Sequence, residues 1–125
     1  MLVVDDEIFF RDLVRASLER AHFAVVEAGD GVEGLALLRQ VRPDVIVCDE
    51  VMPRMTGIQM LRAVRATSET QNIPFLLVTG FASGVWDGMK RSNEQFGILV
   101  KPFTPAELLS ALGEITGVPT DTSLD

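Results

Sequence analysis

Val45-Ile46-Val47-Cys48-Asp49 is a short apolar run that ends in a carboxylate, and three other segments of the chain repeat its pattern. In chain order they are Leu2–Val4 before Asp5-Asp6, Phe75–Val78 before Thr79, and Ile98–Val100 before Lys101. If the four runs are parallel strands of one open α/β sheet, their polar residues emerge at the same carboxyl edge, where such sheets bind ligands. The sequence therefore predicts one site that combines all five polar side chains.

Segments with the spacing of amphipathic helices separate these runs. Phe10, Val14, Leu18 and Ala21 recur three or four residues apart and predict a helix over about residues 8–21. We expect a short strand at residues 24–28 and a capping box formed by Thr104 and Glu107 at the start of the last helix. The inward-facing residues of the other helices are predicted to be Leu35 and Leu38, then Met60, Leu61 and Val64, and finally Leu108, Leu112 and Ile115. This alternation is typical of βαβ units that build a parallel sheet.

Length and composition bound the class of protein. The chain of 125 residues is 47% hydrophobic, which fits one domain with a continuous core. Its formal net charge of −7 argues against direct binding of nucleic acid, which needs a basic surface. No apolar stretch approaches the roughly 18 to 20 residues of a membrane span, and no signal peptide precedes Asp5, so we predict a cytoplasmic location. Cys48, the only cysteine, is expected to pack in the core.

The acidic residues of the predicted site indicate a divalent cation. Asp5, Asp6 and Asp49 supply hard carboxylate oxygens, the ligands that Mg²⁺ and Mn²⁺ prefer. Three carboxylates at one edge repel one another, so the cation or the Lys101 ammonium is needed to keep them ionised. With that charge neutralised, one carboxylate can attack phosphorus to form an aspartyl phosphate, and Thr79 can donate a hydrogen bond to the phosphoryl group.

Each of these residues has a plainer explanation when it is taken alone. An Asp-Asp pair after a strand is commonly a solvated turn or a helix cap, and Thr79-Gly80 fits ordinary turn chemistry. The functional interpretation is preferred because four successive strand ends carry, in order, the residue types that one reaction needs. We interpret His22, between the first helix and the second strand, as a turn residue rather than a phosphoryl carrier.

Four motifs together resemble the receiver domain of bacterial two-component response regulators: Val3–Glu7, Val47–Gly57, Val78–Gly80 and Val100–Phe103. The separations of 43, 30 and 22 residues between Asp6, Asp49, Thr79 and Lys101 agree with that family within a residue or so. The match covers residues 1–116, and a polar tail or the start of a linker follows at residues 117–125.

The resemblance implies a flavodoxin-like, doubly wound fold with a five-stranded parallel sheet in the order 2-1-3-4-5 and five flanking helices. By position, Asp49 is the phosphoacceptor, and Asp5, Asp6, Asp49 and the backbone carbonyl of Val51 bind Mg²⁺, with Mn²⁺ as an alternative. Thr79 and Lys101 contact the phosphoryl oxygens. The implied function is a phosphorylation-operated signalling switch, which is not an enzyme beyond catalysing its own phosphorylation and dephosphorylation.

Residues 82–97 differ most from the family pattern. Their glycines and sparse apolar spacing predict an atypical fourth helix of marginal stability. Trp86 is either an exposed partner contact or an aromatic side chain folded back onto that helix. Where the family usually has Tyr or Phe, three residues before the lysine, this chain has Ile98, so a ring flip cannot couple Thr79 to the surface. We expect phosphorylation to act by ordering this segment instead.

The implied phosphoryl donor is a sensor histidine kinase or a histidine phosphotransfer protein. An effector domain or a homodimer would use the face formed by the fourth helix, the fifth strand and the fifth helix. Two other functions fit less well: a phosphohydrolase usually has a second acid where this chain has Val51, and a pseudo-receiver would have lost a site residue. The sequence is compatible both with a stand-alone protein and with a receiver excised from a longer regulator.

Overall fold

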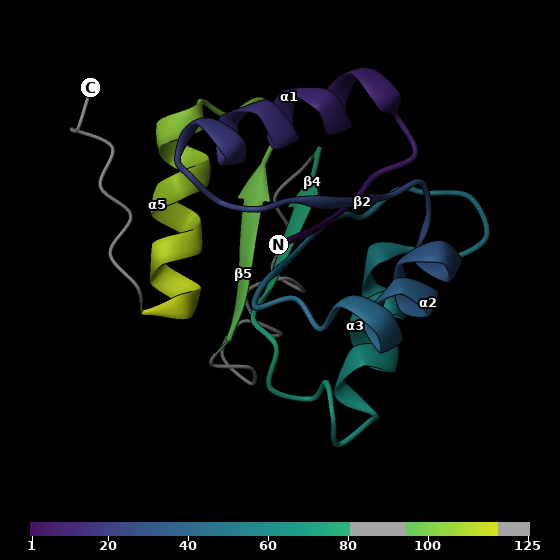
Figure 1. The fold of residues 1–125 in the computed structure, drawn as a ribbon. Coiled ribbons are helices and arrows are strands. Elements are labelled where there is room, and N and C mark those ends of the chain that lie inside the picture. The colour runs from purple at the N-terminus through teal and green to yellow at the C-terminus, as the bar shows by residue number, and fades with distance from the viewer. Residues whose placement is uncertain (81–94, 118–125) are drawn as a thin grey trace.

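The computed structural model describes residues 1–80 and 95–117, in which a parallel sheet lies between two layers of helices (Figure 1). The strands are β1 (Leu2–Val4), β2 (Val26–Ala28), β3 (Ile46–Asp49), β4 (Phe75–Thr79) and β5 (Phe96–Val100). The helices are α1 (Ile8–Arg20), α2 (Gly31–Val41), α3 (Gly57–Arg65) and α5 (Pro105–Thr116). The strand order is β2-β1-β3-β4-β5 with every pair parallel, which confirms the flavodoxin-like topology.

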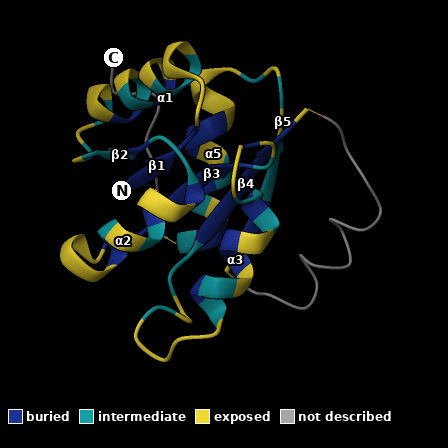
Figure 2. Cartoon of the chain, turned by 90° about the vertical axis from the view of Figure 1, so that its right-hand side faces the viewer, coloured by how far each residue is buried: buried dark blue, intermediate teal, exposed yellow. Residues whose placement is uncertain are grey.

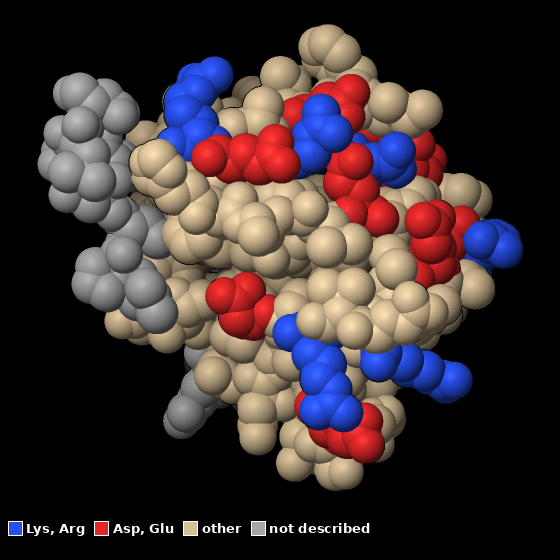
Figure 3. All heavy atoms as spheres, viewed as in Figure 1, with Lys and Arg blue, Asp and Glu red and all other residues tan. Residues whose placement is uncertain are grey.

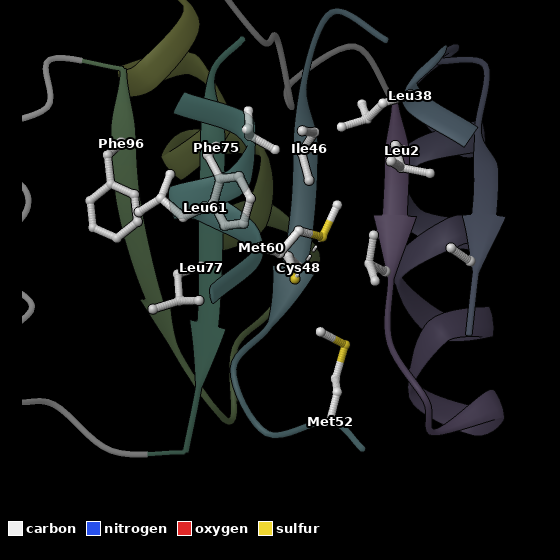
Figure 4. Close-up of a cluster of buried hydrophobic side chains, with 13 residues drawn as sticks. Leu2, Leu38, Ile46, Cys48, Met52, Met60, Leu61, Phe75, Leu77 and Phe96 are labelled. Atoms are coloured by element: carbon white, nitrogen blue, oxygen red, sulfur yellow. Dashed lines mark hydrogen bonds between the residues drawn. The ribbon is translucent and has the colours of Figure 1, made fainter. Parts of the chain in front are cut away.

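Successive residues of each strand face opposite layers of helices, because side chains alternate across a sheet. Leu2 and Val4 of β1 pack in a cluster with α2 and α3, whereas Val3 packs in a second cluster with α1 and α5. Figure 4 shows the first cluster, with side chains of α3 lying over the central strands. Figure 2 shows the sheet buried between helices whose outer faces are exposed. Burial on both faces explains why the strands are continuous apolar runs.

The helical periodicity in the sequence predicted the inner faces correctly. Buried residues of the helices include Val14 and Leu18 of α1, Leu38 of α2, Met60, Leu61 and Val64 of α3, and Leu108, Leu112 and Ile115 of α5. The capping box of α5 is confirmed: Glu107 N–H donates to Thr104 Oγ1 at 3.1 Å, and Thr104 N–H donates to Glu107 Oε1 at 2.9 Å. Cys48 is buried, as expected.

The predicted strand boundaries needed correction. β3 runs from Ile46 to Asp49 rather than from residue 45 to residue 48, and the sheet hydrogen bonds continue past it because Glu50 N–H donates to the Val78 carbonyl at 2.9 Å. β2 begins at Val26 instead of residue 24. β5 begins at Phe96 instead of Ile98. The Phe96 ring is buried and packs near the ring of Phe75, with the two ring centroids 6.4 Å apart.

Two expectations concern residues outside the described ranges. The fourth helix was predicted within residues 82–97, and residues 82–94, which include Trp86, lie outside the described ranges, so the atypical helix and its ordering on phosphorylation stay predictions there. At residues 96 and 97 the prediction is wrong, because Phe96 and Gly97 begin β5. Across residues 1–80 and 95–117, no helix is both long enough and apolar enough to cross a membrane.

Gly57, the first residue of α3, provides a test of how tightly this helix packs on the sheet. A Cβ atom at Gly57 would lie 2.6 Å from the Asp49 carbonyl oxygen and 2.6 Å from Leu77 Cδ1. Because the first of these atoms belongs to the backbone of β3, relief requires the strand or the helix to shift. We expect Gly57→Ala to lower the free energy of unfolding in urea by about 1 to 3 kcal/mol. Gly80→Ala is the control, because a Cβ there meets nothing within 4 Å; equal losses would contradict this account.

Candidate functional site

Three carboxylates meet at the carboxyl edge of the sheet. Asp5 and Asp6 follow β1, and Asp49 is the last residue of β3. Val4 pairs with Cys48, so the next residue of each segment, Asp5 and Asp49, follows at the same level of the sheet. The cluster of Asp5, Asp6 and Asp49 offers one carboxylate oxygen from each residue, and these atoms all lie within 4.8 Å of one another. Asp5 and Asp49 are buried and Asp6 is exposed, so the cluster opens toward solvent on one side.

Burial makes this cluster costly to ionise. It raises the pKa of Asp5 to about 6, with the Asp49 charge adding to the effect, although the hydrogen bond from Glu7 N–H to Asp5 Oδ1 at 2.9 Å opposes it. The pKa of Asp49 is also raised by burial, and the Lys101 ammonium counteracts part of that rise. The Lys101 ammonium therefore offsets only part of the cost of ionising Asp5 and Asp49 in the folded chain.

Lys101 approaches the phosphoacceptor candidate from the far side of β4. Its Nζ lies 3.2 Å from Asp49 Oδ1, and its side chain is 26% exposed. Thr79 ends β4 between the two and is buried, and its backbone carbonyl accepts a hydrogen bond from Lys101 N–H at 2.8 Å. The structure thus brings Asp5, Asp6, Asp49 and Lys101 together and places Thr79 at the end of the intervening strand.

Sequence reasoning missed several residues that hold the site in place. Arg11 of α1 donates from Nη1 to the Asp5 carbonyl at 2.9 Å and to the Ala28 carbonyl at 3.5 Å, which ties the loop after β1 to the end of β2. Glu50 Oε1 accepts Ile58 N–H at 2.8 Å and links the end of β3 to the start of α3. Glu50 lies within the motif Val47–Gly57 and Arg11 lies four residues after the motif Val3–Glu7, but nothing in the sequence states which carbonyl or amide they reach.

Arg11 also belongs to a charged band on the surface of α1 and β2. Figure 3 shows acidic and basic side chains alternating over these elements. Glu27 of β2 lies 3.7 Å from Arg11 and 3.4 Å from Arg15, while Asp12 and Glu19 lie 3.5 and 3.8 Å from Arg15. Such a network restricts Arg11 more than a single exposed ion pair would.

The remaining predicted residues lie in different surroundings. Val51, two residues after Asp49 in the chain, is 72% exposed. Ile98 is partly buried and packs against the cluster on the α2–α3 side of the sheet. His22 has a left-handed backbone (φ 72°) just beyond the end of α1 and donates its N–H to Glu19, which confirms that it is a turn residue.

Comparison with known proteins assigns the chain to a family. The family model described as "Response regulator receiver domain" matches residues 1–113. The chemotaxis response regulator CheY4 of Vibrio cholerae has a solved structure with a TM-score of 0.84 and 38% identity, covering 91% of this chain and 95% of that one. The receiver domain of sensor histidine kinase PA1611 from Pseudomonas aeruginosa has a TM-score of 0.79 at 26% identity, covering 94% and 96% of the two chains.

A longer relative is the DNA-binding dual master transcriptional regulator RpaA of Synechocystis, which is 33% identical over 120 residues. The match covers 88% of this chain but 46% of RpaA, so the chain spans about half the length of that regulator. Both the family model and the structural neighbours cover nearly the whole described fold. The chain therefore belongs to the response regulator receiver domain family.

Proposed function

We propose that Asp49 is the phosphoacceptor of this receiver and that Asp5, Asp6, Asp49 and the backbone carbonyl of Val51 hold Mg²⁺, with Mn²⁺ as an alternative. The observation that carries the proposal is the position of Asp49 Oδ1, which faces Lys101 Nζ at 3.2 Å while its residue also belongs to the cluster of Asp5, Asp6 and Asp49. One carboxylate thus has an ammonium beside it and two further acids as partners for a cation.

The donor set fits a small, hard cation. Mg²⁺ binds oxygens at about 2.1 Å, so two ligands of the same ion lie at most about 4.2 Å apart. The carboxylate oxygens lie within 4.8 Å of one another, so a small inward movement would be enough to bind the ion. Burial is the main cause of the raised pKa of Asp5, so a bound cation would favour the charged form of this carboxylate. A neighbour supports this choice of ion, because the PA1611 receiver structure has a magnesium ion coordinated in its active-site cleft.

Phosphoryl transfer to Asp49 follows from this arrangement. A carboxylate oxygen of Asp49 attacks phosphorus of a phosphohistidine; the P–N bond breaks, and its electron pair stays on the imidazole nitrogen. Lys101 and Thr79 contact the phosphoryl oxygens and stabilise their charge during transfer. When bound, Mg²⁺ supplies a Lewis acid that lowers the repulsion between the phosphoryl group and the carboxylates. The domain would then catalyse only its own phosphorylation and dephosphorylation.

The phosphoryl donor we infer is a sensor histidine kinase or a histidine phosphotransfer protein in the cytoplasm. RpaA is named as a DNA-binding regulator, and this chain matches about half of it, so an effector domain or a homodimer is the proposed output partner. The proposed contact face combines β5 and α5 with the expected fourth helix, which lies outside the described residues. We place the domain boundary at residue 116, where α5 ends before the left-handed cap Gly117.

Phosphorylation of Asp49 is tested with acetyl phosphate and Mg²⁺. Mass spectrometry should show one added phosphoryl group on the native chain, and the addition should disappear in Asp49→Asn and in excess EDTA. Asp44→Asn is a matched control, because Asp44 is an exposed carboxylate five residues earlier and should leave the addition intact. A phosphoryl group retained by Asp49→Asn would refute the assignment.

The stability of the metal-free protein should depend on the charge of Asp5. Because its pKa is raised from 3.8 to about 6, the folded state binds this proton more tightly than the unfolded chain does. That contribution to stability is complete below pH 3.8 and is lost as the pH rises through about 6. Asp5→Asn keeps the acceptor for Glu7 N–H and removes the charge, so in EDTA it should be more stable than the native chain by roughly 2 to 3 kcal/mol above about pH 7.

The same two proteins should have nearly equal stability in EDTA below about pH 4, where native Asp5 is protonated. Saturating Mg²⁺ at neutral pH should raise the melting temperature of the native chain more than that of Asp5→Asn, because only the native chain offers the full carboxylate set. A difference between the proteins that does not change with pH would show that the Asp5 charge is not its cause.

The aspartyl phosphate should be long-lived because Val51, two residues after Asp49, is an exposed apolar side chain that cannot orient an attacking water. Val51→Asn is expected to increase the rate of dephosphorylation several-fold, measured by loss of radiolabelled phosphoryl after the donor is removed. Val41→Asn is the control, since Val41 is an exposed valine at the end of α2. Unchanged decay in Val51→Asn would mean that another feature limits access of water.

A further inference from the structure

The Lys101 side chain has a second contact besides Asp49. Its Nζ lies over the ring of Phe10 at 4.2 Å from the ring centroid, within the distance at which an aromatic face attracts a cation. Phe10 is the third residue of α1, and its ring meets Phe103 at right angles with centroids 5.5 Å apart. The ring is therefore fixed by two different parts of the chain, the helix that carries it and the loop that precedes α5.

A lysine at this place needs such a support. Four rotatable bonds separate its backbone from the ammonium, and holding them in one geometry costs side-chain conformational entropy. The Asp49 contact alone is a weak restraint, because the lysine is partly exposed to water. Phe10 gives the ammonium a preferred position before any phosphoryl group arrives.

An aromatic face also differs from the other groups that could hold an ammonium. A carboxylate in addition to Asp49 would neutralise the charge that the phosphoryl oxygens require, and a carbonyl would compete with them for the N–H donors. The attraction of the ring comes from its quadrupole, which carries no net charge and leaves the hydrogen-bond donors of Lys101 available. The ammonium can thus turn from the Asp49 oxygen toward a phosphoryl oxygen while it stays over the ring.

We propose that Phe10 is a positioning residue for phosphorylation, because its ring holds the Lys101 ammonium beside Asp49 without neutralising it. This inference rests on the proposed function of Asp49 and Lys101, and it adds a residue to which neither the family match nor the motifs assign a role. The two metal ligands after β1 do not depend on this contact, so binding of Mg²⁺ and the rate of phosphoryl transfer should respond differently when Phe10 is changed.

A series of fluorinated phenylalanines at position 10 tests the electrostatic part of the proposal. Each fluorine withdraws charge from the ring face with almost no change in shape, so a packing role would not respond to it. At saturating Mg²⁺ the rate of phosphorylation by acetyl phosphate should fall progressively, to about threefold to tenfold below native in the trifluorinated protein. The Kd for Mg²⁺ should stay unchanged. The same series at Phe9, the exposed neighbour of Phe10 on α1, is the matched control and should have little effect.

Phe10→Leu tests the contact itself. The ring current of Phe10 should shift the Hε protons of Lys101 upfield in NMR spectra of the native protein. Leucine retains apolar volume but has no ring current, so in Phe10→Leu these protons should move to the position of an ordinary lysine. The phosphorylation rate should fall by about the same factor as in the trifluorinated protein. Phe10→Tyr, which keeps an aromatic face, should retain both the shift and most of the rate.

Each result bears on a different claim. A rate that does not change along the Phe10 fluorine series, or Lys101 Hε shifts that are the same in Phe10→Leu and the native protein, would overturn the role of Phe10. If the native chain takes up no phosphoryl group at all, the proposed function fails. If the native chain is phosphorylated on Asp49 while the fluorine series shows no trend, only the present inference fails.

Discussion

The reach of Lys101 across the sheet is the constraint on which the site depends. Lys101 follows β5 and Asp49 ends β3, with β4 between them, so neighbouring-strand spacings of about 4.8 Å put the two backbones about 10 Å apart. Only a long side chain can span that gap, and only if the strands end close to the same level. The register fulfils this condition, because Asp49 pairs with Val78, Val78 pairs with Leu99, and Lys101 follows two residues after Leu99. A slip of one residue would move Lys101 by about 3.3 Å and turn its side chain to the other face. The apolar pairing that fixes the register, including the packed rings of Phe75 and Phe96, therefore also fixes the site.

The same edge of the sheet works against the stability of the fold. Asp5 and Asp49 are buried with raised pKa values, chiefly because burial disfavours their charged forms, so folding brings together charges that water would keep apart. Hydrogen bonds from the backbone offset part of this cost, because Glu7 N–H donates to Asp5 Oδ1 and a backbone hydrogen bond from Glu50 lowers the pKa of Asp49. A cation that binds only the folded state would add stability that rises with the logarithm of its concentration relative to its Kd. The negative charge of Asp5 and Asp49, which the proposed reaction needs, is thus also the reason why the stability of the fold should depend on a bound cation.

The sequence predicted the topology and the acidic cluster because both depend on patterns that do not require exact boundaries. Asp49 was expected just after its strand and is instead the last residue of β3, but in either case it lies at the same edge of the sheet. Phe96 and Gly97 were not recognised as strand residues, because glycine is unfavourable in a strand. In the fold, a Cβ atom at Gly97 would lie 2.7 Å from Ile115 Cγ2, so glycine at this position lets α5 pack on β5. Phe10 was predicted only as an inward helical position, because sequence spacing shows that a ring faces the sheet but not which charged group lies over it.

Helix α1 connects the two halves of the site. Its neighbouring residues Phe10 and Arg11 reach in different directions: the ring lies under Lys101, while the guanidinium holds the carbonyl of Asp5. Because a helix moves as a rigid rod, a displacement of α1 would shift the support of the lysine and the restraint on the metal-binding loop together. The position of α1 is set farther along the helix by Val14 and Leu18, which are buried against β1, β3 and α5 in the same apolar cluster. Packing residues remote from the chemistry therefore help determine the distance between Lys101 and Asp49.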